Sequence, residues 1–229
     1  MTRLNASSAE HRIPNLWTVV VAAGGSSRFG SDKQKVRIGE KTVLELSVAA
    51  AESVGSVVIA TKAEFVTEIE KTFSSNQNVK SVVAGGSTRT ASVSAGLTVV
   101  PETAEIVLVH DGARPLASQT LFKRIADEIN AGVDAVVPAI EIKDSLRSIK
   151  GHEVSRTEIV AVQTPQGFKA STLRAAYLKQ DEFSDDASKV EAEGVKVEII
   201  EGEPNNLKIT HPVDLLVARQ ILKEVEEND

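Results

Sequence analysis

The chain has 229 residues and carries 26 Lys and Arg side chains against 32 Asp and Glu side chains, a formal net charge of −6. Its content of 41% hydrophobic and 25% charged residues is ordinary for a globular protein, which excludes disorder, collagen and disulfide scaffolds. The acidic balance argues against nucleic-acid binding. The lack of cysteine excludes zinc thiolate sites, iron–sulfur clusters and thiol nucleophiles. A reducing cytoplasm fits this composition.

The first 15 residues are polar and lack the apolar core of a signal peptide, so we interpret residues 1–15 as a flexible extension. The apolar run that follows, residues 16–23, is too short to span a bilayer, and we expect no membrane association. It opens a series of short Val-rich and Ile-rich segments that are typical of strands buried on both faces. These segments are residues 18–22, 56–60, 79–83, 105–110, 135–138 and 196–200.

Segments with helical periodicity alternate with these strands. Thr42 and Glu45 form the sequence pattern of a capping box at the start of one of them. The predicted helices are residues 43–54, 64–73, 87–99, 118–131, 170–179 and 185–193, and a last one that begins at Pro212. Strands that alternate with helices predict an α/β fold: a Rossmann-like, mostly parallel sheet with helices on both faces.

The alternation breaks after Pro138, where residues 139–166 are polar, with charges interleaved among Ile and Val. A Lys150-Gly151 pair marks a turn near the middle. We interpret this stretch as an inserted antiparallel β-arm. The predicted organisation is therefore a single domain, residues 16–229, with residues 139–162 as a protruding arm.

Loops that follow the strands of an open α/β sheet gather its ligand. The loop after the first strand consists mostly of small residues and contains one arginine. Two candidate lysines, Lys33 and Lys35, follow a few residues later. Backbone N–H groups of small residues approach an anion closely, and an arginine adds a planar charge, which suits a triphosphate. The alternative is a tight basic turn without a ligand. The candidate residues are Ala22, Ala23, Gly24, Gly25, Ser26, Ser27 and Arg28.

The loop after the third strand contains Gly85 and Gly86 and opens a helix, with Ser92 one turn further on. Glycines let the chain pass close to a base or a ribose. A glycine turn followed by a capping serine explains the same residues equally well.

The loop after the fourth strand is His110-Asp111-Gly112-Ala113-Arg114. Asp111 at a strand end that faces phosphates is a natural Mg²⁺ ligand. Arg114 either holds a second anion or fixes the loop through Asp111. His110 is better explained as a packed residue than as a base.

Further candidates lie in the arm and near the C-terminus. Ser145 and Arg156 belong to a charged hairpin that is alternatively only a solvated face, and Lys208 lies between apolar residues. Two glycine loops, one carboxylate and several cations together indicate a nucleoside triphosphate and a second anionic substrate. No Ser-His-Asp nucleophile is visible, which favours catalysis by positioning and charge.

The chain resembles the 2-C-methyl-D-erythritol 4-phosphate cytidylyltransferases of the non-mevalonate isoprenoid pathway, from about Val19 to about Ile221. The resemblance rests on these stretches and their order: AAGGSSRFG, AGGSTRTASVSAGL, VLVHDGARP, VQTPQGF, SDDASKVEAEG and NNLKITHPVDL. It implies that CTP and methylerythritol phosphate react, with Mg²⁺, to CDP-methylerythritol and pyrophosphate.

The resemblance also implies roles for the candidate residues. Arg28 and a loop lysine would stabilise charge at the α-phosphate, while the loop 24–28 with Gly85, Gly86 and Ser92 would hold CTP. Substrate would be bound by Asp111, Gly112, Arg114, Ser145, Arg156 and Lys208. Ser145 stands where the family often has Thr on the arm. In this family the arm reaches across a homodimer, so Arg156 would serve the neighbouring subunit's site.

Two questions stay open at the level of sequence. Lys35 has the family's usual spacing from Arg28, but Lys33 fits the downstream segment better, and we favour Lys33 as the catalytic lysine. The function has three alternatives: a ribitol 5-phosphate cytidylyltransferase, a non-catalytic nucleotide-binding homologue and a sugar-nucleotide pyrophosphorylase.

Overall fold

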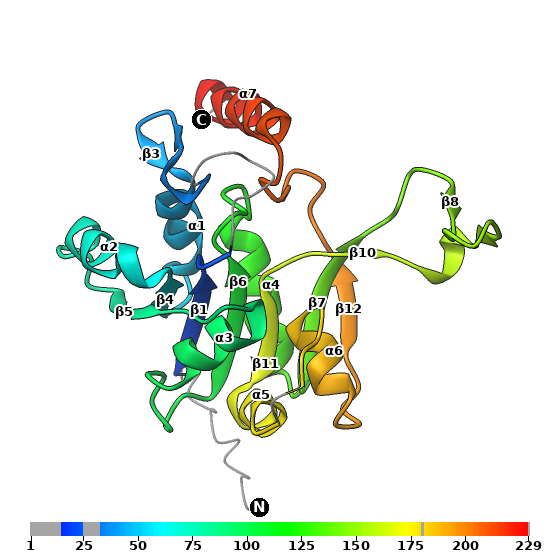
Figure 1. Cartoon of the computed structure of the whole chain (residues 1–229), viewed down its shortest axis with the longest axis horizontal. Helices are drawn as coiled ribbons and strands as arrows, with labels where there is room; N and C mark the ends of the chain where they lie inside the picture. The colour runs from blue at the N-terminus through cyan, green and yellow to red at the C-terminus, as the bar shows by residue number, and fades with distance from the viewer. Residues whose placement is uncertain (1–14, 25–32, 180, 229) are drawn as a thin grey trace, which may run out of the picture.

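The structure is a computed structural model that describes residues 15–24, 33–179 and 181–228. An eight-stranded sheet forms its centre (Figure 1), with the order β10-β7-β11-β6-β1-β4-β5 and with β12 also paired to β7. Only β10 and β11 run antiparallel to their neighbours in this sheet. The strands are β1 (Leu16–Val21), β4 (Ser56–Thr61), β5 (Val79–Ala84), β6 (Ile106–Asp111), β7 (Ala135–Ile140), β10 (Ala161–Val162), β11 (Gln166–Lys169) and β12 (Glu198–Glu201).

Helices cover both faces of the sheet, as the alternating sequence pattern predicts. Helices α1, α2 and α4 pack on one face, and α3, α5 and α6 pack on the other. Their bounds are α1 (Val43–Ala51), α2 (Val66–Thr72), α3 (Arg89–Leu97), α4 (Gln119–Asn130), α5 (Ala170–Tyr177), α6 (Asp186–Glu191) and α7 (Pro212–Asn228). Three short 3-10 turns lie at Lys33–Lys35, Ala63–Phe65 and Arg156–Glu158.

Alternation along the strands divides the core into two layers. In β1, Val20 packs among the residues of α1 and α4, whereas Val19 and Val21 pack with α3 and α5. All three side chains are buried, which explains why the strand is apolar on both faces. A third, smaller cluster joins α7 to a hairpin of β2 (Arg37–Ile38) and β3 (Lys41–Thr42).

The register brings the carboxyl ends of three strands to one edge. Val21 at the end of β1 pairs with Ala60 of β4 and with Asp111 of β6. The candidate loops predicted from the sequence therefore start from a common edge.

Thr42 and Glu45 form the predicted capping box of α1, with both reciprocal hydrogen bonds present.

The arm leaves this edge as a separate hairpin (Figure 1). Its strands β8 (Leu146–Arg147) and β9 (Glu153–Val154) pair antiparallel, and Gly151 between them has a left-handed φ of 92°. Residues 139–140 and 161–162, at the two ends of the predicted arm, pair with each other in the main sheet.

The sequence analysis missed strand β11. It lies antiparallel between β6 and β7, where the chain returns from the arm. Apart from Phe168 its residues carry no strand signal, because Gly167 and the polar Gln166 interrupt the apolar pattern. Among the residues that the structure describes, no helix has the length and apolarity needed to cross a membrane.

Candidate active site

A pocket of about 310 Å³ opens at the carboxyl ends of β1, β5 and β6. Residues from five segments far apart in the sequence meet there, which is where an open α/β sheet binds its ligand. The lining residues are Val21, Ala23, Gly24, Gln34, Gly86, Ser87, Thr88, Arg89, Ser92, Asp111, Ala113 and Lys208. They include predicted candidates from the first and second loops, together with Asp111 and Lys208.

The glycine loop before α3 leaves no room for side chains. A Cβ atom on Gly85 would lie 2.6 Å from Ala23 Cβ and 2.8 Å from Ser92 Oγ, and one on Gly86 would lie 2.3 Å from Ala91 Cβ. Ser92 is buried and donates to Thr88 O at 2.8 Å. Gly86 thus brings bare backbone to the wall of the pocket, Gly85 packs against Ala23 and Ser92, and Ser92 fixes the first turn of α3.

Asp111 is the electrostatic centre of the pocket. Its Oδ2 atom lies 2.7 Å from Lys208 Nζ and 3.7 Å from Arg114 Nε, and its Oδ1 atom lies 3.3 Å from Arg89 Nε. Burial alone would raise the pKa of Asp111, but the charges of Lys208, Arg89 and Arg114 outweigh it and hold the pKa well below its ordinary value. The carboxylate is therefore ionised at neutral pH.

Lys208 reaches Asp111 because the chain before α7 is fastened to the loop after β6. Ile209 N donates to Ala113 O at 2.8 Å, and Arg114 Nη1 donates to Asn206 O at 2.7 Å. Arg114 therefore ties the loop after β6 to the chain before α7, and it is not among the residues that line the pocket. Lys208 itself is partly exposed, with its ammonium group in the pocket wall.

His110 is a packed residue and not a base. It is fully buried, its Nδ1 atom lies 3.2 Å from Thr164 Oγ1, and its ring packs edge-on against Phe122. Burial lowers the pKa of His110 to about 4, so the imidazole is neutral at pH 7. The hydroxyl oxygen of Thr164 also accepts the Asp111 N–H at 3.0 Å and so holds the backbone of Asp111 in place.

Arg89 is a residue of the pocket that the sequence analysis did not single out. It is the first residue of α3, and its guanidinium contacts Asp111 and also Asp186, whose Oδ2 atom lies 2.6 Å from Arg89 Nη1. The sequence signal was its place directly after the glycine loop. Its two acidic partners lie in distant segments, so spacing alone does not reveal the contact.

The two candidate catalytic lysines lie in the same 3-10 turn, Lys33–Lys35. Lys35 is not among the lining residues: its Nζ atom lies 2.5 Å from Glu68 Oε2 and 3.6 Å from the centre of the Phe65 ring. Gly25, Ser26, Ser27, Arg28 and the side chain of Lys33 lie outside the described residues. Ala22 is buried and is not among the lining residues.

The structure does not bring the arm residues to the pocket of their own chain. Arg156 is exposed and donates to Lys143 O at 2.6 Å, within the arm. Ser145 is also exposed on the arm, and neither residue lines the pocket. Gly112 lies behind the pocket wall, where its carbonyl accepts from Ser47 Oγ at 3.1 Å.

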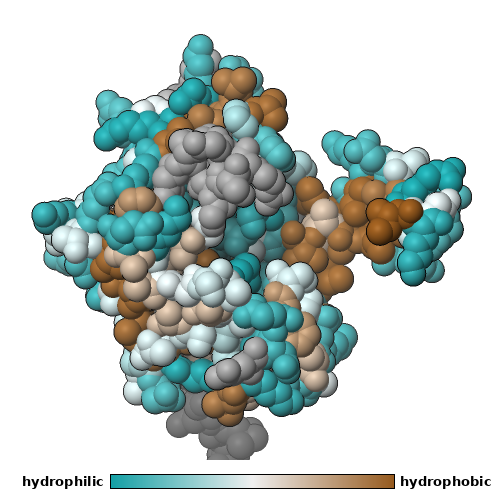
Figure 2. All heavy atoms as spheres, in the orientation of Figure 1, coloured by the Kyte–Doolittle hydropathy of each residue, from teal (hydrophilic) through white to brown (hydrophobic). Residues whose placement is uncertain are grey.

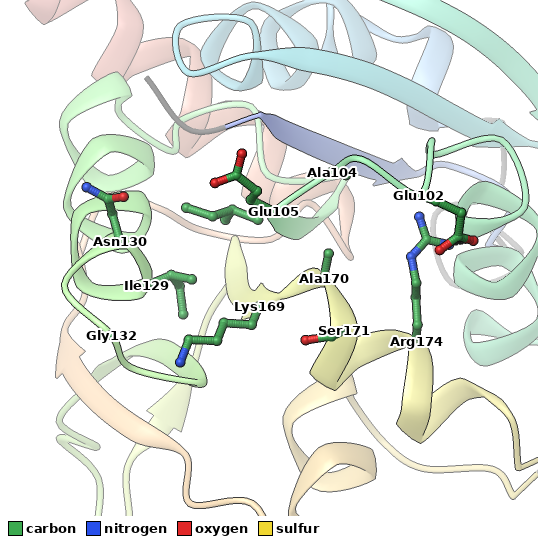
Figure 3. A pocket seen from close by; sticks show the side chains of 11 residues that line it. Glu102, Ala104, Glu105, Ile129, Asn130, Gly132, Lys169, Ala170, Ser171 and Arg174 are labelled. Atoms are coloured by element: carbon green, nitrogen blue, oxygen red, sulfur yellow. Dashed lines mark ion pairs between the residues drawn. The ribbon is translucent and has the colours of Figure 1, made fainter. Parts of the chain in front are cut away.

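A second pocket, of about 440 Å³, lies at the amino end of β6 and the start of α5 (Figure 3). Its cations are paired with acids: Arg174 Nη1 lies 3.5 Å from Glu102, and Lys169 Nζ lies 2.7 Å from Asp134. Glu105 adds another carboxylate to the wall (Figure 3). Because acidic groups balance the positive charges of this second pocket, it suits a triphosphate poorly. The pocket at the carboxyl ends of the strands is therefore the better candidate.

Comparisons with known proteins agree with the geometry. The family model of 2-C-methyl-D-erythritol 4-phosphate cytidylyltransferase (IspD) matches residues 16–224. Proteins of that name from Rhodococcus opacus (strain B4) and Nocardia farcinica (strain IFM 10152) are 41% and 40% identical to this chain. The alignments cover 94% and 89% of this chain and 98% and 92% of those proteins. This chain belongs to the IspD family.

Solved structures give the same result. The structure of 2-C-methyl-D-erythritol 4-phosphate cytidylyltransferase from Thermus thermophilus is 34% identical, with a TM-score of 0.73, and the match covers 90% of this chain and 98% of that one. A synthase structure from Anaerococcus prevotii has a TM-score of 0.81 at 24% identity, covers 93% of this chain and 100% of that one, and supports the fold alone. The mostly parallel sheet and the predicted family are therefore both confirmed. As an IspD family member the chain is a cytidylyltransferase, which is a class of nucleotidyltransferase.

Proposed function

We propose that this protein transfers the CMP group of CTP to 2-C-methyl-D-erythritol 4-phosphate, giving CDP-methylerythritol and pyrophosphate. The observation that carries the proposal is the cluster of Asp111, Lys208 and Arg89 in the pocket at the carboxyl ends of the sheet. Full-length membership of the IspD family supplies the reaction. Nothing in the sequence relatives favours ribitol 5-phosphate as the acceptor.

The chemistry needs no general base. An oxygen of the acceptor's phosphate attacks the α-phosphorus of CTP, the bond to the bridging oxygen breaks, and pyrophosphate leaves with that electron pair. A phosphate monoester has a second pKa near 6 and is largely deprotonated at pH 7. The neutral, buried His110 has no part in the step. Positioning and charge stabilisation therefore carry the catalysis.

We assign roles to the residues on this basis. The backbone at Gly86, which lines the pocket, would bound the space for the cytidine, with Gly85 packed beside it against Ala23 and Ser92. Lys208 would bind the acceptor's phosphate, with Asp111 holding its ammonium in place. Arg28 and Lys33 would meet the α-phosphate. The contact of Lys35 with Glu68 supports Lys33 over Lys35.

We propose that the pocket binds a magnesium ion through a single protein carboxylate. Mg²⁺ prefers oxygen ligands and commonly uses one or two carboxylates together with substrate phosphates. Asp111 is the single acidic residue among the described residues that line the pocket, and it is ionised. Asp111 would hold the ion, together with the triphosphate, through a carboxylate lone pair that its contacts with Lys208, Arg89 and Arg114 leave open. Bound there, the ion supplies positive charge to the phosphates.

We further propose a homodimer in which the arms are exchanged. Arg156 and Ser145 lie on the arm, outside the pocket of their own chain. The arm carries exposed hydrophobic side chains at Ile149, Val160 and Val162, and Figure 2 shows hydrophobic surface along it. Contiguous exposed hydrophobic surface commonly marks a protein interface. A second copy would cover it and would receive Arg156 in its own site.

The test is a pyrophosphate-release assay with Mg²⁺ that pairs each nucleotide with each acceptor. We expect release with CTP and methylerythritol phosphate, and much slower release with UTP or GTP or with ribitol 5-phosphate. Release with ribitol 5-phosphate alone would keep the mechanism and replace the acceptor. CTP binding without release from any acceptor would indicate a non-catalytic homologue.

A further inference from the structure

Arg89 links the pocket to a support outside it. One side of its guanidinium faces Asp111, with Nε 3.3 Å from Oδ1, and the other side faces Asp186, with Nη1 2.6 Å from Oδ2. The Arg89 side chain is 23% exposed and that of Asp186 is fully buried. Because a buried carboxylate is costly unless it is paired, this contact strongly restricts where Arg89 can lie.

Asp186 is itself held by several groups. It is the first residue of α6, and its Oδ1 atom accepts the Tyr177 hydroxyl at 2.5 Å. The preceding residue, Asp185, caps α6 and accepts Gln166 Nε2 at 2.9 Å. The support thus consists of the end of α5, the start of α6 and strand β11, none of which contributes a residue to the pocket lining.

Lys208 depends on the same chain of contacts. Its Nζ atom rests 2.7 Å from Asp111 Oδ2, so a rotation of this carboxylate moves the ammonium group. Asp111 has contacts from Lys208, Arg89 and Arg114. Lys208 and Arg114 both contact Oδ2, whereas Arg89 contacts Oδ1. The contact of Arg89 is therefore the one that opposes rotation of the carboxylate.

We propose that Arg89 is a positioning residue for the transfer reaction: anchored on Asp186, it fixes the Asp111 carboxylate and thereby the ammonium group of Lys208. The inference rests on the proposed function of this pocket. Catalysis by charge needs donors that are already in place when the transition state forms, so loose support reduces turnover more than binding.

The main test is the double variant Arg89→Gln/Asp186→Asn. It removes both members of the pair, so it leaves no uncompensated buried charge and the net charge of the cluster is unchanged. We expect kcat to fall by about tenfold or more, with KM for CTP changed by less than about threefold. The matched control is Lys169→Gln/Asp134→Asn, which removes an exposed ion pair of 2.7 Å at the other end of the sheet. Its kinetic constants should stay within about twofold of the wild type.

Several outcomes would overturn the proposal. One is an unchanged kcat in the double variant. Another is a tenfold rise of KM for CTP at unchanged kcat, which would make Arg89 a direct nucleotide ligand through its Nη2 atom, a group without a hydrogen-bond partner among the described residues. If the double variant does not fold, Tyr177→Phe removes only the hydroxyl that supports Asp186. It should lower kcat about twofold to fivefold at constant KM, and an unchanged kcat refutes the proposal.

The wild-type enzyme distinguishes a failure of this proposal from a failure of the proposed function. If the substrates are wrongly assigned, the wild-type enzyme is inactive as well as the variants. A crystal structure of the double variant then decides independently of activity. Lys208 Nζ should have left its position beside Asp111 Oδ2, and an unchanged pair at 2.7 Å would contradict the positioning role.

Discussion

At the scale of single residues, the charge of the pocket depends on Asp111. Lys208, Arg89 and Arg114 together outweigh its negative charge and leave the site favourable for an anion. The choice between the two candidate catalytic lysines also depends on charge. Lys35 forms an ion pair with Glu68 outside the pocket, which favours Lys33 as the catalytic lysine.

The lysine assignment predicts a clear difference between two variants. Lys33→Ala should lower kcat by about a hundredfold, because it removes a cationic donor to the developing charge. Lys35→Ala breaks a partly exposed ion pair with Glu68 and should retain most of the activity. Steady-state kinetics of both variants measure this, and the reverse order would make Lys35 the catalytic residue.

His110 predicts a pH dependence of stability. Its pKa in the folded protein is about 4, against an ordinary value of 6.5, because burial disfavours the charged form. Between these values the unfolded chain binds more protons than the native one, so the free energy of unfolding falls as the pH is lowered from about 6.5 to about 4. The total loss from this group is up to about 3 kcal/mol. Above about pH 7.5, His110 is neutral in both the folded and the unfolded chain, so it causes no loss of stability there.

Urea unfolding across this pH range measures the effect. The variant His110→Gln should lose the part of the slope that His110 contributes, whereas His152→Gln, which changes an exposed histidine on the arm, should keep it. A stability that is flat between pH 6.5 and 4 in the wild type would show that His110 is not a buried neutral group.

Residue by residue, the sequence predicted those contacts that follow from position in an α/β fold. Asp111 was found because it ends a strand, and Lys208 because it is a cation between apolar residues. Arg89 was missed because its acidic partners, Asp111 and Asp186, come from other segments and meet it only through tertiary packing.

At the scale of elements, the glycine loop and α3 form one unit. Gly85 lies close to both Ala23 and Ser92, so the glycine loop packs against the loop after β1 and against the first turn of α3. A side chain added at Gly85 must therefore displace the loop after β1 or the first turn of α3.

Gly85→Ala should therefore weaken nucleotide binding. Its Cβ atom would lie 2.6 Å from Ala23 Cβ, a distance that forces the two loops apart. We expect KM for CTP to rise about tenfold, and calorimetric titration with CTP to show the same loss. A variant that binds CTP as tightly as the wild type would place the cytidine elsewhere.

Most elements could be predicted because their hydrophobic pattern is strong. The strands of the parallel sheet are buried on both faces and read as apolar runs, and α4 has a clear apolar stripe. Strand β11 could not be predicted, because Gly167 and Gln166 fit only through their tertiary neighbours: a Cβ atom on Gly167 would lie 2.4 Å from Ile125 Cγ2.

At the scale of the whole molecule, the arm separates residues that the proposed reaction needs in one place. Lys208 belongs to the pocket, whereas Arg156 belongs to the protruding hairpin. The sequence indicated the arm by its polar character, because charged residues alternate there with Ile and Val. The proposed exchange of arms makes each active site a product of two chains.

Complementation tests the exchange directly. Arg156→Ala and Lys208→Ala should each be nearly inactive as homodimers. Coexpressed, they should form mixed dimers in which one of the two sites has both residues, so the activity should recover to about a quarter of the wild type. Mixtures that stay inactive despite dimer formation would show that each chain uses its own Arg156.

The proposed reaction forms a bond between a phosphate oxygen of methylerythritol phosphate and the α-phosphorus of CTP. The most direct measurement incubates it with CTP, Mg²⁺ and methylerythritol phosphate labelled with ¹⁸O in the phosphate, and follows the products by ³¹P NMR and mass spectrometry. We expect CDP-methylerythritol with ¹⁸O in its diphosphate, and an equal amount of unlabelled pyrophosphate. Label in the released pyrophosphate, or pyrophosphate without a CDP product, would contradict attack of the acceptor on the α-phosphorus.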